Sequence, residues 1–231
     1  MTQKSFFQPI SGFELPRYAG LPTFMRLPYV GLDNSKISMV EVGIIGAPWD
    51  AGTTNRPGPR HGPRQIRDLS TMIRPQHGVT CFRPFEHKNC ADLGDVAPNP
   101  ANLEDTLKRF EDFYSKVQNH NILPLTVGGD HLCSLPILRS LASGGPVGLI
   151  QFDSHTDLYH SYFNGQLYTH GTPFRRAIEE NLLDPKRIVQ VGIRGTNYDS
   201  EDRDFAKAEG IRIITIEEFF QRGINDIMSE V

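Results

Sequence analysis

Two clusters of polar residues follow apolar segments of the chain and carry side chains that commonly bind metal ions. Asp153, His155 and Asp157 stand at positions i, i+2 and i+4, directly after the apolar residues 147–152. In extended backbone alternate side chains point the same way, so these three groups would face one point. Carboxylate and imidazole suit Mn, Fe, Ni or Zn. A solvated loop is the alternative, but the position after a buried strand favours a metal site.

The second cluster is Gly-Gly-Asp-His at residues 128–131, which follows the apolar residues 122–127. His131 would bring a further imidazole to the metal site, although a single His in this setting is more often a hydrogen-bonded structural residue. The glycine pair is explained by a tight turn from strand to helix that needs an unusual φ angle. A phosphate-binding loop is disfavoured because the chain contains neither Gly-x-Gly-x-x-Gly nor Gly-Lys-Ser/Thr here.

A third candidate is His170, which opens the segment His-Gly-Thr-Pro-Phe. Thr172 is a natural N-cap and Pro173 suits the first position of a helix. An imidazole that titrates near neutral pH can carry a proton to a leaving amine. We therefore predict that His170 is an acid or base close to the metal site; the alternative is an ordinary loop His beside a helix cap.

Strands and helices must bring these clusters together. Runs typical of buried parallel strands lie at residues 40–45, 122–127, 147–152, 188–193 and 211–214. Helices are predicted at residues 62–73, 102–119, 172–181 and 200–209, the second with Asn102 as its N-cap and Asp105 in the capping-box position. The alternation predicts an α/β fold with three αβα layers around a parallel sheet. Both ligand clusters would then lie at one sheet edge, after consecutive and adjacent strands.

The composition is that of an ordinary globular protein, with 231 residues, 38% hydrophobic residues and a formal net charge of −3. No basic run indicates a nucleic-acid or anionic-membrane partner, and no apolar run is long enough to span a bilayer. Residues 1–38 are rich in Pro, Gly and aromatics and predict an arm over one domain formed by residues 39–231. Three cysteines without a secretion signal predict reduced, buried thiols in a cytoplasmic protein: Cys81, Cys90 and Cys133.

Gly-Gly-Asp-His, Asp-Ser-His-Thr-Asp and His-Gly-Thr-Pro-Phe, in this order and spacing, closely resemble the motifs of the ureohydrolase family of arginases, agmatinases and guanidino-acid hydrolases. The resemblance runs from about residue 24 to the end of the chain and includes residues 46–50 and 52–58, Arg60 and residues 62–67. Residues 22–28 and 92–96 are similar to the agmatinase branch. Ser154 replaces the Ala that is usual in the middle motif, a change that we expect to touch no ligand.

This resemblance implies an arginase-like fold with a binuclear site that usually holds two Mn²⁺ ions, or Ni²⁺ in some relatives. His131 and Asp157 would bind one metal and His155 the other, with Asp153 bridging both. His170 would shuttle protons. A hydroxide bridging the two metals would attack the guanidinium carbon of a small-molecule substrate, and the products would be urea and an amine. Family members are commonly trimers or hexamers, so a homo-oligomer is expected.

One motif of the family does not occur in the printed sequence. A later Ser-Phe-Asp-x-Asp-x-x-Asp-Pro strand completes both metal sites in the family, whereas this sequence ends at Val231. We therefore expect the arginase-like domain to be incomplete at its C-terminus, with little or no urea release from residues 1–231 alone. One alternative is a truncated non-catalytic paralogue that retains the fold and associates with an active subunit. Another is a metal amidohydrolase for a different C–N bond, since fold does not fix substrate.

The loop between Asp157 and His170 bears on the substrate. It contains four aromatic residues, whereas arginase has small polar residues here. The resemblance therefore favours agmatine or a guanidino acid such as 4-guanidinobutyrate over arginine. The aromatics would alternatively form a contact between subunits.

Overall fold

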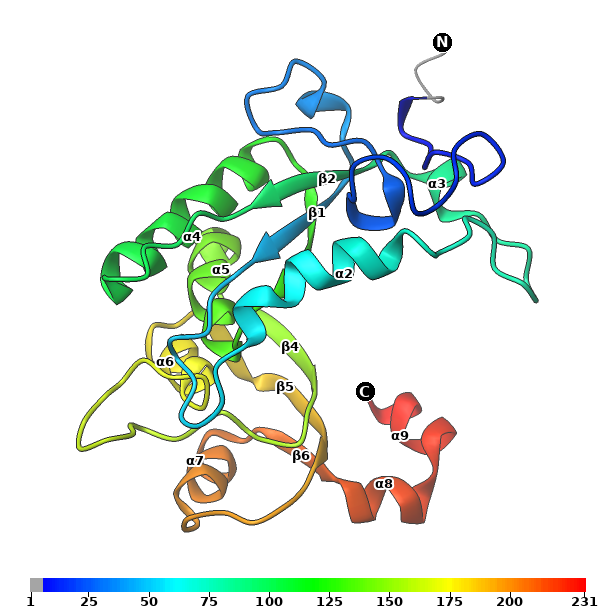
Figure 1. Cartoon of the computed structure of the whole chain (residues 1–231). Coiled ribbons are helices and arrows are strands. Elements are labelled where there is room, and N and C mark those ends of the chain that lie inside the picture. The colour runs from blue at the N-terminus through cyan, green and yellow to red at the C-terminus, as the bar shows by residue number, and fades with distance from the viewer. Residues whose placement is uncertain (1–5) are drawn as a thin grey trace. The chain divides into compact units, whose positions relative to one another are not determined.

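The computed structural model describes residues 6–231, which form two compact units. Unit 1 contains residues up to 51 together with residues 56–130, and unit 2 contains residues 52–55 and 131–231. Each unit has a three-stranded parallel sheet with helices packed against it (Figure 1). Within residues 6–231, no helix is both long and apolar enough to cross a membrane. The division into an arm and one domain stays a prediction.

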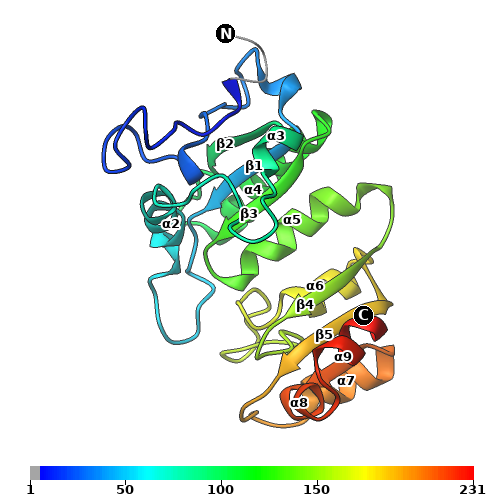
Figure 2. The ribbon, with the colours of Figure 1, turned by 90° about the vertical axis from the view of Figure 1, so that its right-hand side faces the viewer.

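The sheet of unit 1 has the strand order β2-β1-β3, with β1 at Val42–Ala47, β2 at Cys90–Asp95 and β3 at Leu123–Gly128. Figure 2 shows β1 between its two partners. Strand β1 is buried almost throughout, as its apolar run predicts. Strand β2 was missed because it holds two Asp residues and is no apolar run. After β3, Gly129 has φ +49°, which confirms the predicted turn.

The helices of unit 1 are α2 (Gly62–Ser70), α3 (Pro84–His87) and α4 (Leu103–Asn119). Short 3-10 turns lie at Phe24–Arg26, Ile37–Met39 and Pro59–His61. Helix α4 begins as predicted, because the Asn102 side chain accepts a hydrogen bond from the Asp105 N–H at 2.9 Å. Helices α2 and α4 lie on opposite faces of the sheet (Figure 1).

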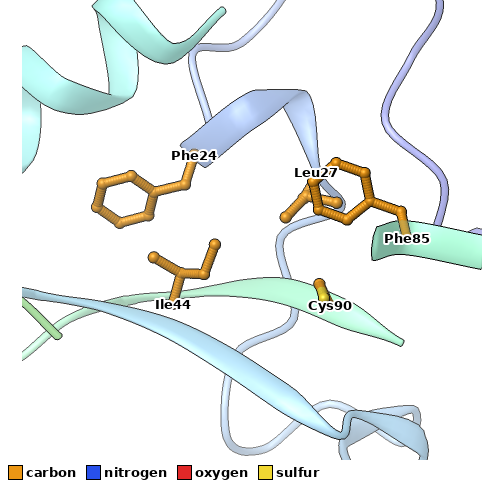
Figure 3. Close-up of a cluster of buried hydrophobic side chains, with 5 residues drawn as sticks. All are labelled: Phe24, Leu27, Ile44, Phe85 and Cys90. Atoms are coloured by element: carbon orange, nitrogen blue, oxygen red, sulfur yellow. The ribbon is translucent and has the colours of Figure 1, made fainter. Parts of the chain in front are cut away.

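The segment before β1 is part of the core of unit 1. Phe24 and Leu27 pack with Ile44 of β1, Phe85 of α3 and Cys90 of β2, and all five are buried (Figure 3). Each large apolar side chain withdrawn from water contributes about 1.5–3 kcal/mol. This part of the predicted arm is therefore held against the sheet by hydrophobic packing.

The three cysteines are free thiols, as the odd count predicts. Cys90 and Cys133 are buried, which confirms two of the three expectations of burial. Cys81 is exposed, so that expectation is wrong for it. It lies in the irregular connection between α2 and α3, where the backbone takes a positive φ of 57° and no element covers the side chain.

The sheet of unit 2 has the order β4-β5-β6, with β4 at Val147–Phe152, β5 at Leu183–Ile193 and β6 at Arg212–Thr215. Its helices are α5 (Ser134–Leu141), α6 (Pro173–Glu179), α7 (Glu201–Glu209), α8 (Ile216–Arg222) and α9 (Ile224–Glu230). Two 3-10 turns lie at His131–Cys133 and Ala142–Gly144. Helices α8 and α9 cover one face through Val191, Ile214 and Ile227, and α6 and α7 lie on the other (Figure 1).

Strands β3 and β4 differ from expectation. Among the described residues β3 pairs only with β1 and β4 only with β5, so the two consecutive strands are not paired with each other. Both also leave apolar side chains exposed, namely Leu123, Leu125, Ile150 and Phe152. The apolar run therefore predicted each strand correctly, but it did not predict which strands and helices pack against it.

Candidate metal site

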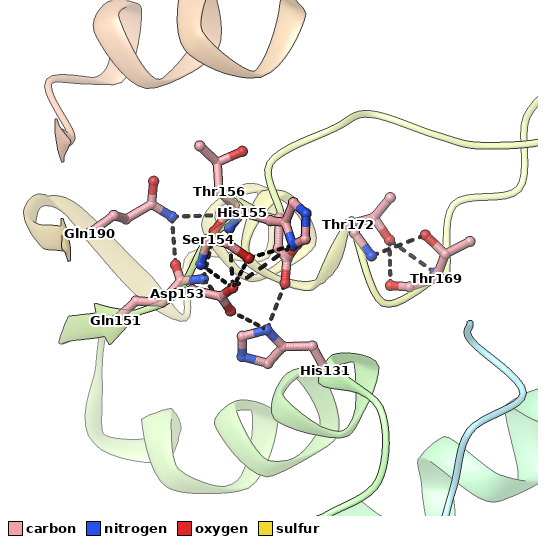
Figure 4. Close-up of polar contacts among 11 residues, drawn as sticks. His131, Gln151, Asp153, Ser154, His155, Thr156, Thr169, Thr172 and Gln190 are labelled. Atoms are coloured by element: carbon pink, nitrogen blue, oxygen red, sulfur yellow. Dashed lines mark hydrogen bonds and ion pairs between the residues drawn. The ribbon is translucent and has the colours of Figure 1, made fainter. Parts of the chain in front are cut away.

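Three of the predicted ligands lie together in unit 2. The ligand atoms of His131, Asp153 and Asp157 are all within 4.8 Å of one another. His131 Nδ1 lies 2.6 Å from Asp157 Oδ2 and 3.3 Å from Asp153 Oδ2. Figure 4 shows the imidazole of His131 directed at the Asp153 carboxylate. One nitrogen and two carboxylates converging on one point form a suitable set of donors for a divalent transition metal.

The elements around the group fix its imidazole. His131 is the first residue of the 3-10 turn His131–Cys133, which leads directly into α5. Its ring packs edge-on against the ring of Phe174 on α6, with 5.0 Å between centroids. Phe174 is buried, so this contact limits the directions in which the imidazole can point.

The electrostatics of the group favour a bound cation. Burial opposes a charge on His131, but hydrogen bonds to Asp153 and Asp157 outweigh it and raise the pKa of His131 to about 10. Burial likewise opposes the charged form of Asp153, yet His131 and the backbone N–H of His155 hold the pKa of this carboxyl well below its usual range. Two ionised carboxylates beside one imidazole leave the group with net negative charge.

His155 is not brought into this group. The chain bends at Asp153 and Ser154, and Asp157 has φ +53°, so the extended geometry expected for residues 153–157 is wrong. The His155 side chain is 74% exposed and its Nδ1 lies 3.9 Å from Asp153 Oδ1. Its assignment as a metal ligand stays a prediction.

Ser154 contacts two of the predicted ligands, contrary to expectation. Its backbone N–H donates to Asp153 Oδ1 at 2.6 Å, and its hydroxyl lies 3.2 Å from His155 Nδ1. The hydroxyl is also 3.5 Å from Asp153 Oδ1. Ser154 is no ligand itself, but the bend at residues 153 and 154 places its hydroxyl between the side chains of Asp153 and His155.

A pair of buried glutamines supports the group and was missed from the sequence. Gln190 of β5 donates from Nε2 to Gln151 Oε1 at 2.6 Å and to the Thr156 carbonyl at 2.7 Å. Gln151 of β4 donates in turn to Asp153 Oδ2 at 3.3 Å and to the His155 carbonyl at 3.1 Å (Figure 4). A signal was present, since each Gln is a polar residue inside a run of otherwise apolar residues, 147–152 and 188–193.

His170 lines a cavity of about 450 Å³ in unit 2 together with His155 and Asp157. Its Nε2 accepts a hydrogen bond from the Thr54 N–H at 3.3 Å and lies 3.0 Å from the Thr54 hydroxyl. Burial lowers the pKa of His170, so the neutral imidazole, which can accept a proton, is favoured. The sequence offered no signal for Thr54 as its partner, because the two residues are far apart in the chain.

The helix after His170 begins at Pro173 as predicted, but Thr172 does not cap it through its side chain. The Thr172 hydroxyl instead donates to the carbonyls of Leu167 and Thr169, at 2.7 and 3.0 Å. These bonds close the loop that presents His170, which explains why the hydroxyl is unavailable to the helix.

The structure is a parallel α/β protein that gathers an imidazole and two carboxylates after its strands, where open parallel sheets commonly place their functional sites. Residues 40–231 match the model of the Arginase family. The chain therefore belongs to the arginase family, which confirms the resemblance found in the sequence.

The relatives agree with this assignment. The chain is 50% identical to a guanidinopropionase and 43% identical to a guanidinobutyrase, both from Pseudomonas aeruginosa, covering 96% and 99% of this chain and 69% and 71% of theirs. The solved structure of proclavaminate amidino hydrolase from Streptomyces clavuligerus matches with a TM-score of 0.86 and 36% identity, over 93% of this chain and 70% of that one. This match confirms the arginase-like α/β fold, and the chain spans about seven tenths of the length of these relatives.

Proposed function

We propose that the protein is a metal-dependent hydrolase that cleaves a guanidino acid such as 4-guanidinobutyrate, or agmatine, to urea and an amine. The observation that carries the proposal is the convergence of His131, Asp153 and Asp157. Asp157 also lines the cavity that holds His170, so a metal-binding residue and a proton carrier share one cavity. The names of the relatives, guanidinopropionase and guanidinobutyrase, support this class of substrate.

The donors present fit Mn²⁺, with Ni²⁺ as the alternative, because both accept oxygen and imidazole ligands. In the proposal His131, Asp153 and Asp157 would hold one ion, and Asp153 together with His155 would hold a second. The His155 side chain is exposed, and among the described contacts its imidazole hydrogen-bonds only to the Ser154 hydroxyl, so the ring can rotate toward Asp153. A complete second site needs more ligands than the described residues bring together.

A divalent metal held there would make water nucleophilic near neutral pH, because a divalent cation lowers the pKa of bound water. The residues of the chain do the rest. Gln190 and Gln151 hold the Asp153 carboxylate in place. Thr54 holds His170, whose neutral imidazole accepts a proton and passes it to the leaving amine, which departs as the C–N bond breaks and urea forms.

The wall of the cavity supports a substrate with a slender aliphatic part. Tyr159, Tyr162 and Tyr198 line it and pack edge-on in pairs, with ring centroids 5.7–6.3 Å apart. Tyr162 also lies so close to Gly171 that a Cβ there would be 2.7 Å from its hydroxyl. Two of the four aromatics in the loop after Asp157, Tyr159 and Tyr162, thus contribute to the cavity itself, which supports the interpretation that the loop selects the substrate.

The test is urea release by the natural full-length protein loaded with Mn²⁺. The panel is 3-guanidinopropionate, 4-guanidinobutyrate, agmatine, arginine and an amide with a different C–N bond. We expect release from the guanidino acids above all and little from arginine. If none of the guanidino compounds released urea, the proposal would be wrong. Cleavage of the amide alone would favour a metal amidohydrolase that acts on a different C–N bond. An inactive protein that co-assembles with an active subunit would favour the non-catalytic paralogue.

The remaining expectations stay predictions: a homo-oligomer, trimeric or hexameric, a cytoplasmic location, and no nucleic-acid or membrane partner. Intact mass under native conditions tests the first. A relative of this chain in Homo sapiens, 40% identical, is named a mitochondrial guanidino acid hydrolase.

A further inference from the structure

The cavity around His170 contains one permanent cation, Arg203, in the first turn of α7. No other Lys or Arg is among the described residues that line it. The Arg203 side chain is 31% exposed, so part of the guanidinium is accessible to a molecule in the cavity. A guanidinium presents donors in a fork that matches a carboxylate.

Arg203 has unmet hydrogen-bonding capacity. Its Nε is buried with no hydrogen-bond partner among the described residues. The carboxylate of Asp202 lies nearby, but the distance from Arg203 Nε to Asp202 Oδ2 is 3.6 Å, which is an ion-pair distance and too long for a hydrogen bond. A guanidinium held beside a cavity without an acceptor is suited to an anionic group of a ligand.

Neither acid of the cavity is free to bind an ammonium group. Asp202 is buried, and its oxygens accept from the Thr156 hydroxyl at 2.7 Å and from the Arg203 N–H at 2.8 Å. Asp157 is engaged with His131 in the metal-binding group. Among the charged side chains that line the cavity, Arg203 is therefore the one with donors left for the tail of a substrate.

We propose that Arg203 binds the carboxylate of a guanidino acid and thereby makes the protein select guanidino acids against agmatine. The inference rests on the proposed function, because it assumes that the guanidino end of the substrate lies at the metal-binding group. Agmatine carries an ammonium group where the acid carries a carboxylate. Arg203 attracts the carboxylate and repels the ammonium, so a single residue discriminates in both directions.

The experiment compares Arg203→Gln and Arg203→Lys with the wild type in the natural full-length protein. Lys207→Gln is the matched control, since it removes one positive charge from an exposed position of the same helix. The ligands are 4-guanidinobutyrate, agmatine and butylguanidine, which has no charged tail. Both kcat/KM from urea release and Kd from ligand-detected NMR are measured, and thermal melting checks that each variant is folded.

In Arg203→Gln we expect kcat/KM for 4-guanidinobutyrate to fall, and its Kd to rise, by about 10- to 100-fold, because a hydrogen-bonded charge pair is lost. Arg203→Lys should give values between those of the wild type and Arg203→Gln, because an ammonium keeps the positive charge but lacks the forked donors of a guanidinium. Butylguanidine should be unaffected, agmatine should improve, and Lys207→Gln should match the wild type. Equal losses of kcat/KM for 4-guanidinobutyrate and butylguanidine would overturn the assignment, because a structural defect would impair both substrates alike.

The binding measurement separates this inference from the proposed function. If the wild type binds 4-guanidinobutyrate no more tightly than butylguanidine, the carboxylate anchor is wrong whether or not urea is released. If binding follows the expected pattern and no urea appears, Arg203 keeps its role and the hydrolytic proposal fails.

Discussion

Both units place aspartates at or near strand ends, but they neutralise them differently. In unit 1 the buried Asp92 of β2 is bound by both Nε and Nη2 of Arg67, at 2.7 and 2.9 Å, and the same guanidinium reaches Asp95 at 2.6 Å. In unit 2 Asp153 and Asp157 share one imidazole, that of His131. Arginine is a permanent cation, whereas imidazole can release its proton and become a metal ligand.

A second aspartate of unit 1 repeats the pattern. Asp50 is fully buried, and Arg60 lowers its pKa to about 2 by a hydrogen bond that outweighs the effect of burial. The backbone N–H of Gly58 adds a bond to the same carboxylate at 2.6 Å. Asp50 and Asp92 of unit 1 thus form closed ion pairs with structural roles, whereas the carboxylates around His131 in unit 2 keep unbalanced charge that a cation can satisfy.

The largest effect is expected on turnover, from a residue of unit 2. His170→Ala in the full-length protein should retain its metal and lower kcat by about 10²–10⁴-fold, because the proton carrier is lost. Kinetics with added imidazole check the role, since a small base should restore part of the rate. His120→Ala, which removes an exposed His from unit 1, is the control. Normal turnover in His170→Ala would make His170 structural and weaken the contrast between the units.

The next effect is expected on stability, from unit 1. Asp92→Asn should lower the free energy of unfolding by about 3–5 kcal/mol, because it removes the main partner of the Arg67 guanidinium. The Arg67 side chain is only 13% exposed, so water cannot replace that partner fully. Urea denaturation measures the change. Asp112→Asn breaks an exposed ion pair with Lys108 in the same unit and should change stability by less than about 1 kcal/mol. Similar effects of the two variants would contradict the description of Asp92 as a closed pair.

Substitution of an aspartate in unit 2 should affect metal binding more than stability. Asp153→Asn should weaken Mn²⁺ binding by about 10- to 100-fold or more, since even indirect supports of metal ligands contribute this much. It should lower the stability of the metal-free protein less than Asp92→Asn does, because it removes one of two neighbouring carboxylates. Elemental analysis and titration measure the binding, with the exposed Asp199→Asn as control. Unchanged Mn²⁺ binding in Asp153→Asn would refute our assignment of Asp153 as a ligand.

The contrast between the units also shows where the sequence was informative. Strands β1, β4 and β6 were predictable because each coincides with a short run of apolar residues. Helix α4 was predictable because its apolar residues recur at helical spacing and Asn102 caps its first turn. Strand β2 was not, because Asp92 is acceptable there only when Arg67, 25 residues earlier, neutralises it. The group of His131, Asp153 and Asp157 was predictable from the positions of the strand ends. The orientation of His155 was not, because it depends on one bend and on the positive φ of Asp157.

The smallest effect is expected from Ser154, whose hydroxyl lies 3.2 Å from His155 Nδ1. This hydrogen bond holds the imidazole away from the group formed by His131, Asp153 and Asp157, so Ser154→Ala should tighten Mn²⁺ binding by about two- to tenfold, the net worth of one hydrogen bond. The backbone N–H that binds Asp153 is retained in Ala, so Asp153 keeps its orientation. A double-mutant cycle isolates the interaction, because the effect of Ser154→Ala must vanish when His155 is already Ala. Weaker binding in Ser154→Ala would instead mean that the hydroxyl supports Asp153, which it approaches to 3.5 Å. An effect that persists in His155→Ala would remove His155 from the set of ligands and leave the site of unit 2 with three protein donors.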